Sequence, residues 1–383
     1  MLANYDWIEF VLKFVMVTTK YINTDILREW LENGKEVSVV DIRPSGERAE
    51  WYIPESIHVN IFEKLKANDE TALSGLHLDK DIPVVVVCAA GKTSLKAAEI
   101  LNTKVYDAYS LENGMKGWSL AWNRATLSFK DYEIIQLRRT GKGCLSYIIN
   151  SGNDAIVIDA SLPAEVYNEI VKQNGWQLNA VMETHIHADH LSRSKQLTED
   201  FAVDLFLPTP NKVSFPYKSL QNNQTLKLGK ITIKVIATPG HTLESACFFV
   251  NNEVLFTGDT LFTNSIGRPD LKANDDEAEQ KARLLYQSLQ SLMKLDHNVL
   301  ILPAHTNTPV DFDNIPIKAT IAEIKNKVSI LQLPEADFLK TILDNLPPTP
   351  ANFLTIVEKN LSGDFSDINP VELEAGANRC AIS

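Results

Sequence analysis

Short apolar runs alternate with helix-like segments in the first third of the chain. VSVVDI ends at Ile42 and IPVVVV ends at Val87, and the second run is followed by a helical pattern from Ser94 to Leu101. Runs rich in Val and Ile are typical of strands buried on both faces, and helices between them would cover those faces. The pattern predicts an α/β domain, a parallel sheet with flanking helices, over residues 18–125.

A second series of strand patterns begins after a boundary that we place between Ala125 and Lys130. DYEIIQLRR, CLSYIIN and AIVIDA are rich in β-forming residues and are separated by the turn sequences GKG and SGND. Later segments run from apolar residues into a polar cluster: NAVMETHIHADH, IKVIATPGHT, EVLFTGDTLF and NVLILPAHT. Polar clusters at strand ends predict a functional site on a rigid scaffold, in a second domain over residues 131–383.

The composition is that of a folded protein, and the charge disfavours some partners. The chain is 44% hydrophobic and 22% charged, and its formal net charge is −12. Nucleic acids and anionic lipid surfaces repel such a chain, so we expect neither as a partner. Residues 1–17 are apolar but interrupted by Asp6, Glu9 and Lys13, and we interpret them as an N-terminal extension and not a membrane span. The four scattered cysteines favour a reducing, cytoplasmic setting.

The strongest chemical signal is the set of histidines and aspartates in the polar clusters. Four potential ligands fall within the six residues from His185 to His190, and later motifs add His241, Asp259 and His305. Five of the eight histidines lie in these motifs. Imidazole and carboxylate are ligands for Zn, Fe and Mn, and crowding them is unfavourable without an ion. The pattern predicts a metal site.

These motifs resemble those of the metallo-β-lactamase superfamily over about residues 131–310, which implies an αββα sandwich. THIHADH, TPGHT, FTGDTLF, GRPDL and the ANRC tail are most similar to the persulfide dioxygenases, relatives of hydroxyacylglutathione hydrolase. The resemblance assigns one Fe(II) per chain to His185, His241 and Asp259. The other ligand-type residues would orient these ligands or form a second metal site: His187, Asp189, His190 and His305. In the hydrolases they bind metal, so two Zn ions per chain remain the alternative.

Arg268, in the GRPDL motif, matches an arginine near the substrate pocket of the dioxygenases. A guanidinium there would bind a glutathione carboxylate through two hydrogen bonds. The resemblance therefore implies glutathione and its persulfide as small-molecule partners. We leave a homodimer open as a further partner.

Cys88 carries a second chemical signal. It ends the VVVV strand and begins CAAGKTS, a short loop before a helix. Loop N–H groups and the positive end of a helix stabilise an anionic sulfur, and Lys92 adds a positive charge. VVDIRPSGERAEWYIPESIHVN, CAAGKT and ENGMKGW resemble a rhodanese domain over about residues 18–122. That resemblance implies that Cys88 carries sulfane sulfur from thiosulfate or a persulfide, within a loop of Ala89, Ala90, Gly91, Lys92 and Thr93.

The remaining cysteines carry no such signal. Cys144 and Cys247 lie in apolar strand patterns and are interpreted as core residues, and Cys380 as packed or free. The whole pattern favours a sulfur-metabolism enzyme that oxidises a glutathione-type persulfide with O₂ to sulfite, coupled to transfer of sulfur from or to thiosulfate. Two alternatives stay open: a zinc-dependent hydroxyacylglutathione hydrolase-like thioesterase with a rhodanese domain, and a sulfur-carrier or redox-sensing protein with a degenerate metal site.

Overall fold

The chain divides into two units in its structure, a computed structural model that describes residues 20–208, 213–271, 273–350, 352–376 and 380–382. The first unit ends at Trp118, earlier than the boundary predicted between Ala125 and Lys130. The difference arises because strand β6 (Asn123–Ser128) pairs antiparallel with β7 (Glu133–Arg138) and so joins the second unit. The predicted extension over residues 1–17 lies outside the described residues.

The first unit contains the predicted parallel sheet, with strand order β1-β5-β4-β2-β3. The VVVV run forms β4 (Val84–Val87) at the centre, with all four side chains fully buried, because a parallel sheet is covered on both faces. The other strands are β1 (Tyr21–Ile22), β2 (Ser38–Asp41), β3 (Ile57–His58) and β5 (Ala108–Leu111). The helices are α2 (Thr24–Glu32), α3 (Ser45–Glu50), α4 (Phe62–Lys66), α5 (Thr93–Thr103) and α6 (Gly114–Trp118).

Two sheets packed face to face form the second unit. Their orders are β12-β11-β10-β9-β8-β7-β6 and β13-β14-β15-β16-β18-β19. One core cluster takes residues from both sheets, such as Ile149 from the first and Phe248 from the second. The remaining strands of the two sheets are β8 (Leu145–Ser151), β9 (Asp154–Ile158), β10 (Gln177–Met182), β11 (Asp204–Pro208), β12 (Lys218–Leu220), β13 (Thr225–Leu228), β14 (Ile231–Ala237), β15 (Ala246–Val250), β16 (Val254–Gly258), β18 (Leu300–Pro303) and β19 (Ala319–Thr320).

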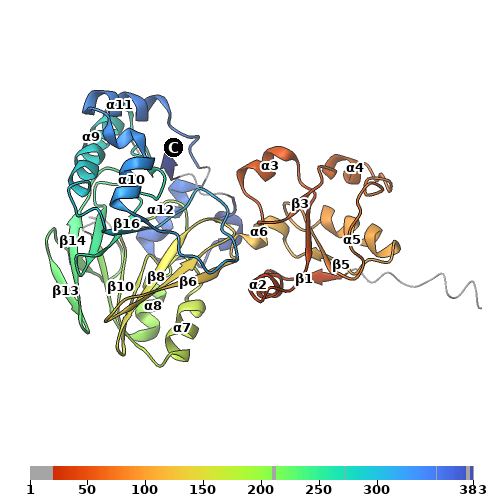
Figure 1. The fold of residues 1–383 in the computed structure, drawn as a ribbon, viewed down its shortest axis with the longest axis horizontal. Coiled ribbons are helices and arrows are strands. Elements are labelled where there is room, and N and C mark those ends of the chain that lie inside the picture. The colour runs from red at the N-terminus through yellow and green to blue at the C-terminus, as the bar shows by residue number, and fades with distance from the viewer. Residues whose placement is uncertain (1–19, 209–212, 272, 351, 377–379, 383) are drawn as a thin grey trace, which may run out of the picture. The chain divides into compact units, whose positions relative to one another are not determined.

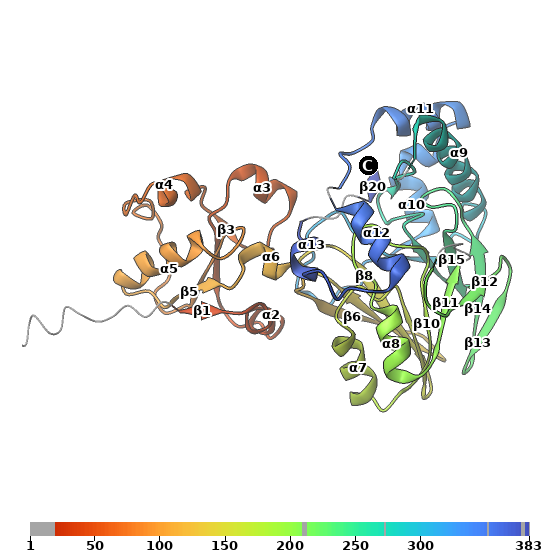
Figure 2. The same ribbon diagram turned by 180° about the vertical axis from the view of Figure 1, so that it is seen from behind.

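Helices cover the outer faces of both sheets. Helices α7 (Ala164–Gln173) and α8 (Ser194–Phe201) pack on the seven-stranded sheet through a second core cluster. On the other side lie α9 (Asp275–Leu292), α10 (Ile321–Lys327), the short helix η1 (Ser329–Gln332) and α11 (Glu335–Asp344). Figures 1 and 2 show the two helix groups on opposite sides of the sheets. The predicted αββα sandwich is confirmed.

The end of the chain returns to the sandwich. After α12 (Phe353–Ser362) and α13 (Pro370–Leu373), strand β20 (Ala381–Ile382) pairs antiparallel with β17 (Ile266–Gly267). This pairing joins the C-terminal residues to the start of the GRPDL motif. Among the residues that the structure describes, no helix has the length and apolar character needed to cross a membrane.

Candidate metal centre and sulfur-transfer site

Three of the predicted metal ligands come together at the ends of strands from both sheets. His185 follows β10, His241 follows β14 and Asp259 follows β16. Their ligand atoms lie within 4.8 Å of one another, and the side chains are at most 2% exposed. Gly258 allows this approach, because a Cβ there would lie 2.5 Å from Oγ1 of Thr184 and its φ of +51° suits glycine.

Hydrogen bonds fix which ring nitrogen each histidine offers. Oγ1 of Thr184 donates to Asp159, so it accepts from Nδ1 of His185, 2.9 Å away. Nδ1 of His241 donates to the backbone carbonyl of Arg268 at 2.8 Å. In both rings the proton is therefore on Nδ1, and the lone pair of Nε2 is available to a metal. Nε2 of His185 and of His241 lie 3.8 Å and 3.6 Å from Oδ2 of Asp259.

The chemical state of this group fits a metal ion. Nε2 of His185 and Oδ2 of Asp259 are buried and have no hydrogen-bond partner in the protein, which is costly unless another group binds there. Burial lowers the pKa of His185 well below its ordinary value, and also lowers that of His241, so both rings are neutral. Burial alone would raise the pKa of Asp259, but His305 lowers it and keeps the carboxylate charged. Two neutral imidazoles and one carboxylate suit a divalent transition metal.

A second buried group adjoins the first. The ligand atoms of Cys144, Asp189, His190 and His305 lie within 4.8 Å of one another. Asp189 accepts from the Cys144 thiol at 3.2 Å, and its carboxylate lies 3.1 Å from Nδ1 of His190 and 2.7 Å from Nε2 of His305. Nδ1 of His305 also contacts Asp259, so His305 links the two groups. This second group could hold another metal ion or orient the first ligands.

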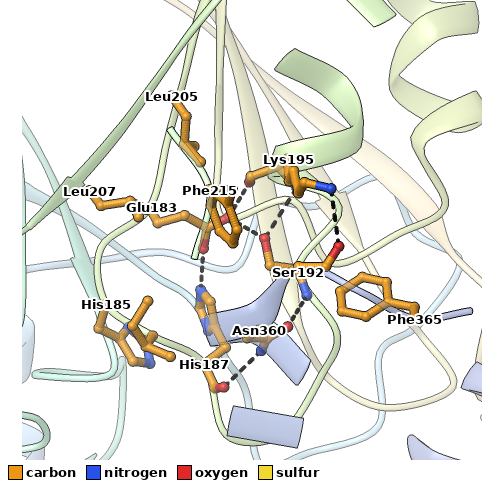
Figure 3. Close-up of a pocket in the computed structure, with 13 residues that line it drawn as sticks. Glu183, His185, His187, Ser192, Lys195, Leu205, Leu207, Phe215, Asn360 and Phe365 are labelled. Carbon is orange, nitrogen blue, oxygen red and sulfur yellow. Dashed lines mark hydrogen bonds and ion pairs between the residues drawn. The ribbon is translucent and has the colours of Figure 1, made fainter. Parts of the chain in front are cut away.

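His187 lies beside both groups, with its ring centroid 4.1 Å from that of His185 and 4.2 Å from that of His190, but its Nε2 contacts other carboxylates. Its Nε2 lies 3.0 Å from a carboxylate oxygen of Glu183 and 3.3 Å from one of Asp159. Burial alone would lower the pKa of His187, but these two carboxylates raise it well above its ordinary value. Figure 3 shows the ring joined to Glu183, beside a pocket that Ser192 and Phe215 also line. His187 therefore differs from His185 in its partners, although both belong to one motif.

Two cysteines at the site were not predicted there. Cys144 was interpreted as a core residue, but it belongs to the second group. Burial and Asp189 raise the pKa of its thiol, yet His305 and His190 outweigh them and bring the value to about 7. Cys380 lies with its sulfur within 4.8 Å of ligand atoms of Asp259 and His305, because the β17–β20 pairing carries it there. A contact made by a two-residue strand at the chain end leaves no periodic signal in the sequence.

Arg268 is placed differently from the prediction. Its side chain is fully buried, and Nε and Nη2 donate to the Asp270 carboxylate at 2.8 Å and 2.7 Å. The backbone carbonyls of Pro347 and Pro348 accept further hydrogen bonds from the guanidinium. Because these partners engage the guanidinium inside the protein, it does not present the fork that a substrate carboxylate would need. Its backbone carbonyl instead orients His241.

Cys88 lies where the sequence predicts, at the end of β4 and the start of the loop that leads to α5. The thiol is 2% exposed, whereas Lys92 in the loop is exposed. The N–H groups of Met115 and Lys116 donate to the carbonyls of Cys88 and Ala89 at 2.9 Å and 3.1 Å. The ENGMKGW motif therefore holds the predicted sulfur-binding loop in place.

Close packing supports this loop, and a buried ion pair lies at the end of the adjacent strand β2. A Cβ at Gly114, whose φ is +53°, would lie 2.1 Å from the Cys88 carbonyl oxygen, so only glycine fits. Asp41 and Arg43 form a buried ion pair of 2.7 Å, and Arg43 also donates to the carbonyl of Trp51. These charges are satisfied within the protein.

Comparisons with known proteins identify both units. Residues 139–305 match the metallo-β-lactamase superfamily, and residues 23–121 match the rhodanese-like domain. A hydroxyacylglutathione hydrolase of Prochlorococcus marinus is 30% identical over 220 residues, which are 53% of this chain and 84% of that protein. The chain belongs to the metallo-β-lactamase superfamily. It carries a rhodanese-like domain before the superfamily domain, which confirms the predicted fusion.

Further relatives leave the reaction open. A hydroxyacylglutathione hydrolase of Francisella philomiragia is 33% identical over 161 residues, 42% of this chain, and the chain spans only 61% of that protein's length. ETHE1 from Myxococcus xanthus has a TM-score of 0.52 and 26% identity, covering 60% of this chain and 97% of that one. A metallo-β-lactamase from Staphylococcus aureus shares the fold, with a TM-score of 0.56 and 24% identity over 63% of this chain and 74% of that one.

Proposed function

We propose that the second unit is an iron-dependent persulfide dioxygenase and that the first unit transfers sulfane sulfur through Cys88. The reaction converts a glutathione-type persulfide, dioxygen and water into thiol and sulfite. One observation carries the proposal: a buried group of two histidines and one aspartate occurs in the same chain as a rhodanese-like unit with a cysteine in its loop. Both units would then handle the same sulfur atom. A cytoplasmic, reducing setting belongs to this proposal, because it preserves thiols.

The residues that would hold one Fe(II) are His185, His241 and Asp259. Two histidine nitrogens and one carboxylate are the donor set of many non-haem Fe(II) oxygenases, and bound iron supplies the redox chemistry that dioxygen requires. Thr184 and the carbonyl of Arg268 keep the two imidazoles turned with Nε2 toward Asp259. The contact of His305 with Asp259 holds the carboxylate in place from the other side. The chain thus preorganises its ligands through hydrogen bonds.

The alternative is a hydroxyacylglutathione thioesterase with two zinc ions. A specific observation favours it as second candidate: Cys144, Asp189, His190 and His305 form a buried group able to hold a second ion, next to the first. Hydrolases at 30% and 33% identity are also among the relatives. Two adjacent ions would activate water for attack on a thioester carbonyl.

Metal content and oxygen uptake distinguish these functions. Protein purified without air should contain one iron per chain and consume oxygen with glutathione persulfide. His241→Ala should lose both metal and oxygen uptake, because it removes one of three ligands. Two zinc ions with hydrolysis of a hydroxyacylglutathione and no oxygen uptake would establish the thioesterase instead. Absence of both activities and of bound metal would favour the remaining alternative, a sulfur-carrier or redox-sensing protein.

The direction of sulfur transfer also belongs to the proposal. Cys88 could supply persulfide by taking sulfur from thiosulfate, or it could consume sulfite by giving sulfur back to form thiosulfate. Assays with thiosulfate, sulfite and glutathione as partners separate the two directions.

A further inference from the structure

The Cys88 thiol lies at one end of a chain of two buried serine hydroxyls. Its Sγ is 3.2 Å from Oγ of Ser94, in the first turn of α5, and that oxygen is 2.9 Å from Oγ of Ser110 in β5. Oγ of Ser110 also donates to the carbonyl of Gly91 at 3.3 Å. Both serines are fully buried. The hydroxyls therefore connect the nucleophile to a carbonyl of its own loop.

This chain can run in two directions, because each hydroxyl donates one proton and can also accept. When the sulfur carries a proton, the thiol donates to Ser94, Ser94 donates to Ser110, and Ser110 donates to Gly91. An anionic sulfur, or one bonded to a sulfane sulfur, has no proton to donate. Ser110 then donates to Ser94, and Ser94 donates to the sulfur. Hydrogen bonds to an ionised acceptor are about twice as strong as neutral ones, so the second direction favours the reactive thiolate.

We propose that Ser94 is a positioning residue for Cys88 in sulfur transfer and that Ser110 acts through Ser94. This inference rests on the sulfur-transfer function proposed above. By reversing the direction of these hydrogen bonds, the two hydroxyls hold the Cys88 sulfur in one place while it passes from thiol to thiolate to persulfide. The backbone N–H groups of a loop cannot reverse in this way, because they only donate.

The transfer step balances without a further reactant. The Cys88 thiolate attacks the outer sulfur of thiosulfate, and a new bond forms between Sγ and that sulfur. The bond from the outer sulfur to the sulfonate sulfur breaks, and its electron pair leaves with sulfite. Cys88 is left as a persulfide anion, and the total charge is unchanged. Ser94 donates to Sγ before and after the step, so the nucleophile does not need to move.

The test uses the full chain with Ser94→Ala, Ser110→Ala, the double variant and Ser94→Thr, which keeps a hydroxyl. Thr103→Ala is the matched control, because Thr103 lies on the same helix with its hydroxyl exposed and bonded to the carbonyl of Ile100. Two quantities are measured: the rate at which iodoacetamide alkylates Cys88, followed by mass spectrometry of its peptide, and kcat and KM for sulfur transfer from thiosulfate to cyanide.

Removing the Ser94 hydroxyl should lower the alkylation rate and kcat about tenfold, the lower range for a hydrogen bond to a charged group, with KM for thiosulfate unchanged. Ser94→Thr should retain most of both rates. Ser110→Ala should lower both rates less, about threefold, because the Ser94 hydroxyl remains as a donor to the sulfur and is only weakened. Since Ser110 acts through Ser94, the double variant should react no more slowly than Ser94→Ala. Thr103→Ala should react like the unchanged protein.

Several results would overturn the proposal. One is an alkylation rate and kcat in Ser94→Ala equal to those of the wild type. Another is a raised KM with unchanged kcat in that variant. A third is a double variant whose loss of rate equals the product of the losses in the two single variants. If Ser94→Ala fails to fold, Ser110→Ala decides. Wild-type rates in Ser110→Ala would refute the hydrogen-bonded path to Cys88, and lower alkylation rate and kcat would support it. If the unchanged protein neither takes sulfur from thiosulfate nor transfers sulfur to sulfite, the proposed function fails, while the alkylation rates still decide whether the hydroxyls activate Cys88.

Discussion

The buried guanidinium of Arg268 stabilises the backbone that orients His241, one of the proposed metal ligands. Its pair with Asp270 and its bonds to the segment at Pro347 fix the backbone from which the Arg268 carbonyl reaches Nδ1 of His241. Mutation of a partner that orients a metal-binding histidine typically costs about tenfold to a hundredfold in metal affinity or activity. Arg268 therefore belongs with the metal centre in its expected effects.

Replacing Arg268 with alanine should weaken metal binding about tenfold, the lower end of the range for groups that orient metal ligands, because the carbonyl remains and only the support of its backbone is lost. Metal content after dialysis against a chelator measures this loss. Arg283→Ala is the matched control, because Arg283 is 47% exposed and pairs with Glu279 and Glu335 at the surface, so its loss should leave metal content unchanged. Full metal content in Arg268→Ala, with a raised KM for the persulfide, would contradict this role and restore the contact with substrate that the sequence predicts.

For single residues, the sequence predicts which residue types form the site better than it predicts which other residues they contact. Residue chemistry indicates a metal site, and the resemblance to persulfide dioxygenases assigns His185, His241 and Asp259 to one ion. Their ligand atoms do lie together, although they stand in separate motifs. Cys144 and Cys380 could not be assigned in this way. Each reaches the site through pairing between backbone segments far apart in the chain, Cys144 with His305 and the chain end with β17.

Among the elements, the C-terminal segment is tied to the metal loop by a buried carboxylate. Glu374, just after α13, is fully buried and accepts from the N–H of Leu191, which follows the HADH motif. Arg139 and Arg193 both lie 3.2 Å from the same carboxylate. Burial alone would raise the pKa of Glu374, but these two arginines lower it below its ordinary value.

Glu374→Gln should destabilise the protein by about 3–5 kcal/mol near neutral pH, because it leaves two buried arginines without their counter-charge. The folded-state pKa of Glu374 is depressed, so the carboxylate contributes its full stability above its ordinary pKa of 4.5 and loses it as the pH falls further. The difference in free energy of unfolding between wild type and Glu374→Gln should therefore narrow below that pH. Urea titrations between neutral and acidic pH measure it. A difference that stays constant, or widens in acid, would show that the carboxylate is not held ionised.

The regular elements follow from local pattern where they are long or fully apolar. The VVVV run becomes β4, and the helical pattern after Cys88 becomes α5. The domain boundary does not follow in the same way. Strand β6 alternates buried and exposed residues like many edge strands, and only its pairing with β7 assigns it to the second unit. Such pairing depends on tertiary structure, which a local pattern does not contain.

For the whole molecule, the proposal assigns separate chemistry to each unit. Cys88 belongs to the first unit, and all members of the metal groups belong to the second. A change at one site should therefore leave the chemistry of the other intact. His241→Ala should transfer sulfur from thiosulfate to cyanide at the wild-type rate although it binds no metal, since the Cys88 loop takes its support from residues of its own unit.

Cys88→Ser tests whether the two activities are coupled through their shared sulfur atom. A serine oxygen is not a nucleophilic thiolate at neutral pH and cannot hold sulfane sulfur as a persulfide, so sulfur transfer should vanish. Oxygen uptake with preformed glutathione persulfide should survive, because the metal ligands are untouched.

Uptake driven by thiosulfate plus glutathione should disappear in Cys88→Ser if the first unit supplies the persulfide. If instead the unchanged protein never uses thiosulfate but accumulates it from persulfide, the first unit acts on sulfite after the oxidation, and Cys88→Ser should release sulfite in its place. Unchanged product and unchanged flux in Cys88→Ser would refute the coupling, since a serine cannot substitute for the sulfur carrier in either direction.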